Sequence, residues 1–382
     1  MDILEFAFWF STLIMIYAYF GYPFVLVLLG KVLGRQGGES PIISEPKVSV
    51  ILVVQNEQGR LPGRLRNLLR SDYPREKLEI LVVSDGSDDE TNRILLDIAR
   101  DHKGDPKIVP ILYPEKRGKS IVIPEVVSAA LGEIFVFADA RQDFCSNSIR
   151  HLVSHFGDPS VGAVTGQLIL SKGGEDGAVG ENLVKYWEYE KWVRSLESGI
   201  RTVSCVTGAI YAVRKDLFPP LPPQLLAEDL YVTLAILSRG HDVLYDPEAV
   251  AYDQVQSEER ELSRKRRTLC GNYQILSMLL ENNVVLKQKP LFVLLSHKGI
   301  RLVIPFILVA IIILNGFLAV LSGLAIYKIT FIIQIMFYGM GVFHYIFKFR
   351  GIALSRMAFA YMQFNLSAIF AYIKFRKSDY TW

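Results

Sequence analysis

Three apolar stretches that each end in polar or acidic residues constrain the fold of this chain more than any other feature. They are FVFADARQDF (residues 135–144), VILVVQNEQ (50–58) and EILVVSDGSDDET (79–91). Continuous apolar runs are typical of strands buried on both faces of a parallel sheet. The carboxyl ends of such strands meet at one edge, where open α/β sheets bind nucleotides. The sequence therefore predicts a nucleotide-binding crevice.

Strand-like and helix-like segments alternate around these stretches. Apolar runs predict strands at 48–54, 80–83, 108–112 and 134–138, and helical spacing of apolar residues predicts helices at 61–69, 90–99 and 120–131. This order is that of an α/β fold with a doubly wound, mostly parallel sheet. Beyond residue 144 the pattern is less regular. We expect a strand at 161–170, a strand pair or a strand with a Gly bend at 203–214, a short edge strand at 243–245, and helices at 180–196 and 225–239.

Long apolar segments flank this region. Residues 6–30 carry no charge and can cross a bilayer core of ~30 Å. The length of the run and the lack of preceding basic residues favour a retained transmembrane helix over a signal peptide. Segments 302–320, 329–347 and 352–373 approach the ~20 residues of a spanning helix. The last contains Arg356, Gln363 and Asn365, which leaves its topology open.

These features divide the chain into five parts. We expect an N-terminal transmembrane helix (1–33), a linker rich in Gly, Ser and Pro (34–47), a central α/β domain (48–283), an amphipathic surface helix (284–301) and C-terminal transmembrane helices (302–382). Basic residues flank the spans on the side of the central domain. They predict a multi-pass protein of the cell membrane, in contact with membrane lipid, whose central domain is cytoplasmic.

Composition excludes several other classes. The net charge of +3 indicates no nucleic-acid partner. Cys145, Cys205 and Cys270 form no CxxC pair, which argues against a disulfide framework and a zinc site. The chain contains neither GxGxxG nor a P-loop, so hydride transfer and ATP chemistry are not indicated.

Five motifs occur in an order that resembles one known family. They are VVQNEQ, SDGSDDET, KRGKS, FADAR and LLAEDLYV. In this order, between flanking spans, they resemble the membrane-bound family 2 glycosyltransferases, the inverting group that includes cellulose, hyaluronan and poly-N-acetylglucosamine synthases. The resemblance covers roughly residues 48–273 and implies a GT-A-type fold.

The first three motifs imply a nucleotide-sugar donor. By resemblance, Gln55, Asn56 and Glu57 lie beside the nucleobase and Asp85 binds base and ribose. Lys119 follows Gly118 near an expected helix start, where a cation and free backbone N–H groups suit a pyrophosphate. Taken singly, each has a plainer interpretation: a polar helix entry, a cap, or a solvated run of charge.

The fourth motif implies a divalent cation. FADAR matches the family's metal-binding Asp-x-Asp only at Asp139, because Arg141 occupies the second aspartate position. Either Asp139 binds Mg²⁺ or Mn²⁺ together with water and the diphosphate, or Arg141 itself neutralises phosphate charge.

The fifth motif implies the catalytic base. Inverting transfer needs a group that takes the proton from the acceptor hydroxyl. By resemblance this is Asp229, with Glu228 beside it, although two carboxylates at a helix start could also only complement the helix dipole. Gly208 and Ala209, in VTGAIYAVR, would line the acceptor pocket.

A weaker element concerns the acceptor. The family's Gln-x-x-Arg-Trp corresponds to RKRRTLCGN, in which Arg267 keeps the arginine as a phosphate ligand and Thr268 replaces the tryptophan. The resemblance thus implies transfer from a nucleotide-diphosphate sugar, UDP-linked by family, to a polysaccharide or lipid-linked sugar. Two alternatives stay open: a single-addition enzyme acting on a polyprenyl-phosphate or glycolipid acceptor, and a non-catalytic UDP-binding scaffold.

Overall fold

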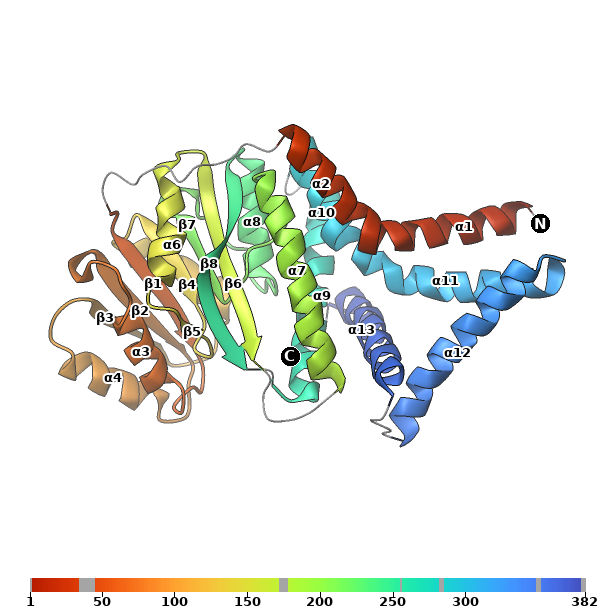
Figure 1. Ribbon diagram of the computed structural model, residues 1–382. Helices are drawn as coiled ribbons and strands as arrows, with labels where there is room; N and C mark the ends of the chain where they lie inside the picture. Colours follow the sequence, from red (N-terminus) through yellow and green to blue (C-terminus); the bar gives the residue numbers. More distant parts are fainter. Residues whose placement is uncertain are drawn as a thin grey trace.

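The computed structural model describes residues 2–33, 45–171, 178–254, 256–281, 285–347 and 352–378. The predicted linker (34–47) lies mostly outside these ranges. Figure 1 shows a sheet domain and a group of long apolar helices, with α7 (Ala178–Gly199) standing between them.

Within the described residues, the sheet has eight strands in the order β3-β2-β1-β4-β7-β6-β8-β5. They are β1 (Val48–Val54), β2 (Leu78–Asp85), β3 (Lys107–Tyr113), β4 (Ile134–Ala138), β5 (Asp143–Phe144), β6 (Val161–Ser171), β7 (Ile210–Arg214) and β8 (Asp242–Gln254). The first four strands are parallel, and β7 joins the sheet antiparallel to both β4 and β6. The predicted α/β fold with a mostly parallel sheet is confirmed.

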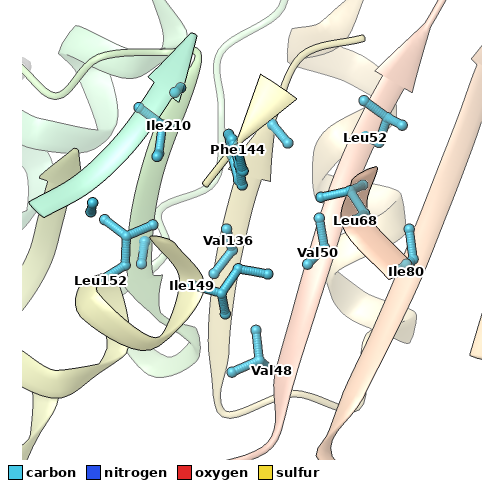
Figure 2. Close-up of a cluster of buried hydrophobic side chains, with 14 of the residues drawn as sticks. Val48, Val50, Leu52, Leu68, Ile80, Val136, Phe144, Ile149, Leu152 and Ile210 are labelled. Carbon is cyan, nitrogen blue, oxygen red and sulfur yellow. The ribbon is translucent and has the colours of Figure 1, made fainter. Parts of the chain in front are cut away.

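Helices cover both faces of this sheet. They are α3 (Leu61–Leu69), α4 (Thr91–Asp101), α5 (Lys119–Ala129), α6 (Ser148–Ser154), α8 (Glu228–Ser238) and α9 (Glu258–Leu280). On one face Val50 and Leu52 pack with Leu68 of α3 and Ile149 of α6 (Figure 2). On the other, Ile51 packs with residues of α5 and α8. Because side chains alternate along a strand, β1 is buried on both sides, which explains its uninterrupted apolar run.

Two predicted strands differ from the structure. The short edge strand expected at 243–245 is the beginning of β8, a 13-residue strand that lies between β6 and β5. Asp246 and Pro247 resemble a turn in the sequence, but the β6–β8 pairing continues past them with a register shift opposite Thr165–Gln167. The segment 203–214, expected as a strand pair or a strand with a Gly bend, forms a strand only at Ile210–Arg214, and a turn from Thr207 to Ile210 that contains Gly208 precedes it, which agrees with the second alternative.

Three helical segments of the described chain are long and apolar enough to cross a membrane: Asp2–Val32, Gln288–Leu321 and Ala325–Phe347. The first comprises α1 (Asp2–Ile16) and α2 (Tyr22–Leu33), and the second α10 (Gln288–Leu294) and α11 (Ile300–Leu321). In each, a π-helical turn joins the two helices. The third is α12. Figure 1 shows α1 beside α11.

The amphipathic helix expected at 284–301 is not a separate element. Residue 284 lies outside the described residues, and α10 continues through the π-helical turn at Leu295–Gly299 into α11. Two of the basic residues in this segment face protein, because Lys298 and Arg301 both approach Glu190 of α7, whereas Lys287 and Lys289 are exposed.

The last apolar segment forms α13 (Ala353–Arg376), which is not among the three candidate spans. It packs against α9 and α12 and touches α7. Arg266 of α9 donates to Ser367 at 3.4 Å and stacks on Phe370, so α13 connects the apolar helices to the sheet domain.

Candidate functional site

The loops after β1 and β2 are joined by hydrogen bonds. The amide of Asn56 donates to Ser87 Oγ at 3.1 Å, and Asn56 Oδ1 accepts from the amide of Asp88 at 3.0 Å. Asn56 has φ = 55°, a left-handed conformation that asparagine tolerates well. Glu57 donates through its amide to Thr91 Oγ1 at 2.9 Å, and Gln55 is exposed. The loop expected to hold the nucleobase is therefore fixed by hydrogen bonds and forms an exposed rim at the ends of the strands.

Asp85 holds the loop that leads to Lys119. Its Oδ1 accepts from the amide of Arg117 at 2.7 Å and its Oδ2 from the amide of Gly118 at 2.8 Å. Gly86 makes this approach possible, because a Cβ there would lie 2.1 Å from the backbone nitrogen of Lys116. A carboxylate has about four acceptor positions, so Asp85 keeps capacity for a ligand hydroxyl.

Lys119, at the start of α5, forms an ion pair with Asp139 at the end of β4. The Nζ–Oδ1 distance is 2.5 Å, and both side chains are about one-third exposed. Burial alone would favour the neutral forms, but the pair outweighs it: the pKa of Lys119 is raised, and the pKa of Asp139 is lowered by Lys119 with help from Arg141 and Arg267. Both groups are therefore charged at neutral pH.

Arg141 turns towards a different carboxylate. Its Nη2 lies 2.6 Å from Oδ2 of the buried Asp253 of β8, which also accepts from Gln142 at 2.8 Å. The second position of the Asp-x-Asp motif is thus engaged in an ion pair within the sheet. Its positive charge still acts on Asp139.

Asp229 lies in the first turn of α8, with Glu228 before it. Its Oδ1 accepts from the amide of Leu230 at 2.8 Å. Burial raises the pKa of Asp229 and of Glu228, and for Glu228 the neighbouring Asp229 carboxylate adds to the rise. Gly208 packs directly against the aspartate, since a Cβ on Gly208 would lie 3.2 Å from Asp229 Oδ2.

One cavity brings these groups together. It is lined by Ile51, Val53, Lys119, Ile123, Phe137, Ala138, Asp139, Gly208, Tyr211, Glu228 and Asp229. The strand end at Asp139 and the helix start at Asp229 therefore share one space. Sequence reasoning missed Tyr211, whose ring stacks on Phe137 at 4.6 Å between centroids. It lies within VTGAIYAVR, but alternation along a strand does not reveal which face meets a ligand.

Other predicted residues lie outside the lining of this cavity. Gln55, Asn56, Glu57 and Asp85 belong to the rim formed by the strand-end loops, and Arg141 pairs with Asp253. Ala209 is buried in the sheet core that includes β1 and α3 rather than facing Asp229. Arg267, on α9, is exposed, and its charge acts on Asp139 and Asp229.

Comparisons with known proteins agree with this arrangement. Residues 49–218 match the family described as Glycosyl transferase family 2. This segment is a family 2 glycosyltransferase domain. An N-acetylglucosaminyltransferase of Rhizobium meliloti (strain 1021) is 28% identical over 217 residues, which are 54% of this chain and 50% of that protein. A poly-beta-1,6-N-acetyl-D-glucosamine synthase of Staphylococcus aureus (strain MSSA476) is 23% identical over 67% of this chain and 61% of its own length.

A solved glycosyltransferase shares the fold over nearly the whole chain. The mannosyltransferase PcManGT of Pyrobaculum calidifontis, solved in complex with GDP-Man and Mn²⁺, aligns over 97% of this chain and 98% of its own with a TM-score of 0.69 and 21% identity. The present chain spans about half the length of the first curated relatives it matches. The predicted GT-A-type fold of the glycosyltransferase domain is confirmed.

The residues of this domain could hold a divalent cation only together with the phosphates of a nucleotide ligand. Among the described residues, no group of three or more His, Cys, Asp or Glu side chains could hold a metal ion. Asp139 offers one carboxylate, and Lys119 already contacts one of its oxygens. Mg²⁺-type sites in nucleotide enzymes commonly use one or two carboxylates plus substrate phosphates. Asp139 matches that donor set, whereas the described part of the chain offers no metal cage made by protein alone.

Proposed function

We propose that this chain is an inverting glycosyltransferase that works at the cytoplasmic membrane face. It transfers a sugar from a nucleotide-diphosphate donor, a UDP-sugar, to a hydroxyl of a polysaccharide or lipid-linked acceptor. The observation that supports this most strongly is the shared cavity, in which the Lys119–Asp139 pair and the Asp229 carboxylate face one space.

The donor would lie along the carboxyl edge of the sheet. Asp85 and the Gln55–Glu57 loop would hold the nucleoside, and the cations of Lys119 and Arg267 would contact the diphosphate. A divalent cation held by Asp139 and diphosphate oxygens would offset charge on the departing nucleotide. In this position the sugar's C1 would point into the cavity, towards Asp229.

Asp229 would act as general base. The acceptor hydroxyl oxygen forms a bond to C1, while the bond between C1 and the phosphate oxygen breaks and its electron pair leaves with the nucleoside diphosphate. The hydroxyl proton passes to Asp229. Burial raises the pKa of this carboxyl, which makes it a stronger base than an exposed aspartate. Glu228 stands beside it in the cavity, where the cation of Lys119 partly compensates the second carboxylate.

The membrane assignment rests on the three apolar helices and on charge. Basic residues near the domain ends of these helices favour a cytoplasmic domain. The relatives named above include a polysaccharide synthase, which is why a polymer is one of the two acceptor classes proposed.

A donor screen with purified protein in detergent tests the proposal. Labelled UDP-sugars are incubated with and without Mn²⁺, and products are separated by length. Transfer that is lost in Asp229→Asn, while UDP binding is kept, is the expected result. Binding of UDP without turnover for any sugar donor would favour the non-catalytic scaffold instead.

Single addition to a lipid-linked acceptor is the second candidate. It is favoured by Thr268, which takes the place of the family's tryptophan, is exposed on α9 and donates to the carbonyl of Arg264. A ladder of product lengths in the same screen would exclude it, and one product of fixed length would support it.

A further inference from the structure

Helix α7 presents three buried charged residues at helical spacing. Glu190, Arg194 and Glu197 are 2%, 6% and 0% exposed. Residues three and four apart lie on one face of a helix, so these three charges share a stripe. Charged side chains are almost never buried this deeply without partners. The partners of the three residues therefore show what the stripe does.

The two glutamates bind the apolar helices. His297, which is fully buried in the π-helical turn before α11, places Nδ1 2.6 Å from Glu197 and Nε2 3.1 Å from Glu190. Arg301 pairs with Glu190, and the Tyr22 hydroxyl donates to Glu197 at 2.6 Å. The two glutamates, one at each end of the stripe, thus connect α7 to two of the candidate membrane spans.

Arg194 has different partners from the two glutamates, and one of them lies in the segment that leads to Gly208. Its Nη1 donates to Thr207 Oγ1, and its guanidinium lies 5.5 Å from the ring centre of Trp187. Thr207 is itself buried and donates through its amide to Thr165 Oγ1 at 2.7 Å. The carbonyl of Thr207 accepts from the amide of Ile210 at 2.9 Å, which closes the turn that contains Gly208.

This turn is joined to the start of α8. The amide of Val206 donates to Thr233 Oγ1 at 3.1 Å, and the same hydroxyl donates to the carbonyl of Asp229 at 2.7 Å. Gly208 comes two residues after Val206, and a Cβ on it would lie 3.2 Å from Asp229 Oδ2. The backbone at 206–208 is thus fixed from α8 by Thr233 and from α7 by Arg194.

We propose that Arg194 is a positioning residue for the acceptor side of the site, acting through Thr207 to set the place of the Gly208 turn against Asp229. The inference rests on the proposed function, because it assigns the space beside Gly208 to the acceptor. Arg194 is not among the residues that line the cavity, and its guanidinium donates to Thr207, so the role proposed for it is to position the turn. Its charge also acts on Asp229, where it opposes the effect of burial on the pKa of that carboxyl.

The kinetic consequence is specific to the acceptor. A turn displaced by a few tenths of an ångström would change the path of the attacking hydroxyl and leave the donor edge of the sheet unaltered. Thr207→Val removes the oxygen that accepts from Arg194 and keeps the side-chain volume, while Thr207→Ser keeps the oxygen. Arg194→Met removes charge and hydrogen bond, and Arg194→Lys keeps the charge alone.

We expect Thr207→Val and Arg194→Met to lower kcat/KM for the acceptor by about 10- to 100-fold, with the Kd for UDP unchanged. Thr207→Ser should retain wild-type values. Arg194→Met should also move the acid limb of the pH profile to higher pH, which Arg194→Lys should not do. The matched control is Thr202→Val, because Thr202 is a buried threonine of the same segment whose hydroxyl donates to the carbonyl of Ile200.

A double-mutant cycle between Arg194→Lys and Thr207→Val provides the second measurement, should Arg194→Met fail to fold. Strong non-additivity in acceptor kcat/KM supports the proposal, and additive effects overturn it. The proposal would also be overturned if the Thr207→Val protein folds and keeps wild-type kinetics and the wild-type pH profile. If wild-type protein shows no transfer at all, the proposed function fails first, so the two failures are distinguishable.

Discussion

The ammonium group of Lys119 lies 2.5 Å from Oδ1 of Asp139, and both side chains line the cavity that Asp229 also faces. A cation and an anion in direct contact can separate when a ligand carries both signs. A diphosphate with its divalent cation is such a ligand, because its phosphates could pair with Lys119 and its metal ion could be bound by Asp139. In the proposed function, the pair would therefore preorganise both halves of the donor site.

Removing the ammonium group should weaken donor binding. For Lys119→Met we expect the Kd of UDP to rise about 10- to 100-fold, because a hydrogen bond between charged groups contributes roughly 1.5–3 kcal/mol. Titration calorimetry with UDP and Mn²⁺ measures this. Lys116→Met, at an exposed position of the same loop, should bind as wild type. Equal losses in both variants would point to general attraction of charge rather than to a specific contact.

The raised pKa of Asp229 has opposite consequences for activity and stability. Its usual value is 3.8, and burial raises it. Activity requires the ionised form, so kcat/KM should fall on the acid side at a higher pH than an ordinary aspartate would give. The same shift means that the carboxyl stabilises the fold below pH 3.8, and that this contribution is lost as pH rises through the raised pKa.

At neutral pH the buried charge therefore costs stability. We expect Asp229→Asn to abolish transfer and yet unfold at a temperature no lower than wild type, measured by thermal unfolding at pH 7. Asp216→Asn, at an exposed carboxylate, should change neither quantity. A marked loss of thermal stability in Asp229→Asn would show that the ionised group is stabilising where it stands.

Glycine at 208 should matter for function more than for folding. Gly208→Ala places a methyl group 3.2 Å from Asp229 Oδ2, tighter than ordinary van der Waals contact, in the space where the acceptor would approach. We expect kcat/KM for the acceptor to fall by roughly tenfold or more, with UDP binding retained. Gly63→Ala is the control, because open space surrounds that position in α3. Wild-type acceptor kinetics in Gly208→Ala would remove this turn from the acceptor pocket.

His297 should be important for stability. Its two ring nitrogens lie within hydrogen-bond distance of Glu190 and Glu197, so His297→Ala leaves two buried carboxylates without their shared partner. Removing one partner from a buried charged network costs about 3–5 kcal/mol. The unfolding midpoint of detergent-solubilised protein should fall clearly. His151→Ala, whose ring is partly exposed and lies 3.8 Å from Asp246, should change it little.

The sheet and its catalytic edge follow from local pattern. The strands predicted at 48–54 and 134–138 coincide with β1 and β4, and the helix predicted at 61–69 with α3. Strands buried on both faces must be continuously apolar, and polar residues can begin only where the strand leaves the core. For that reason the sequence predicts that Asp85, Asp139 and the Asn56 loop lie at one edge of the sheet.

The sequence alone thus determined the α/β order, the apolar spans and the positions of the carboxylates. Only the tertiary structure decided which partners they meet. Arg141 turns to Asp253, 112 residues away along the chain, and His297 is enclosed by two glutamates of α7. Arg194 reaches the turn beside Asp229. Such pairings depend on how helices and strands distant in sequence pack, and no local periodicity records that packing.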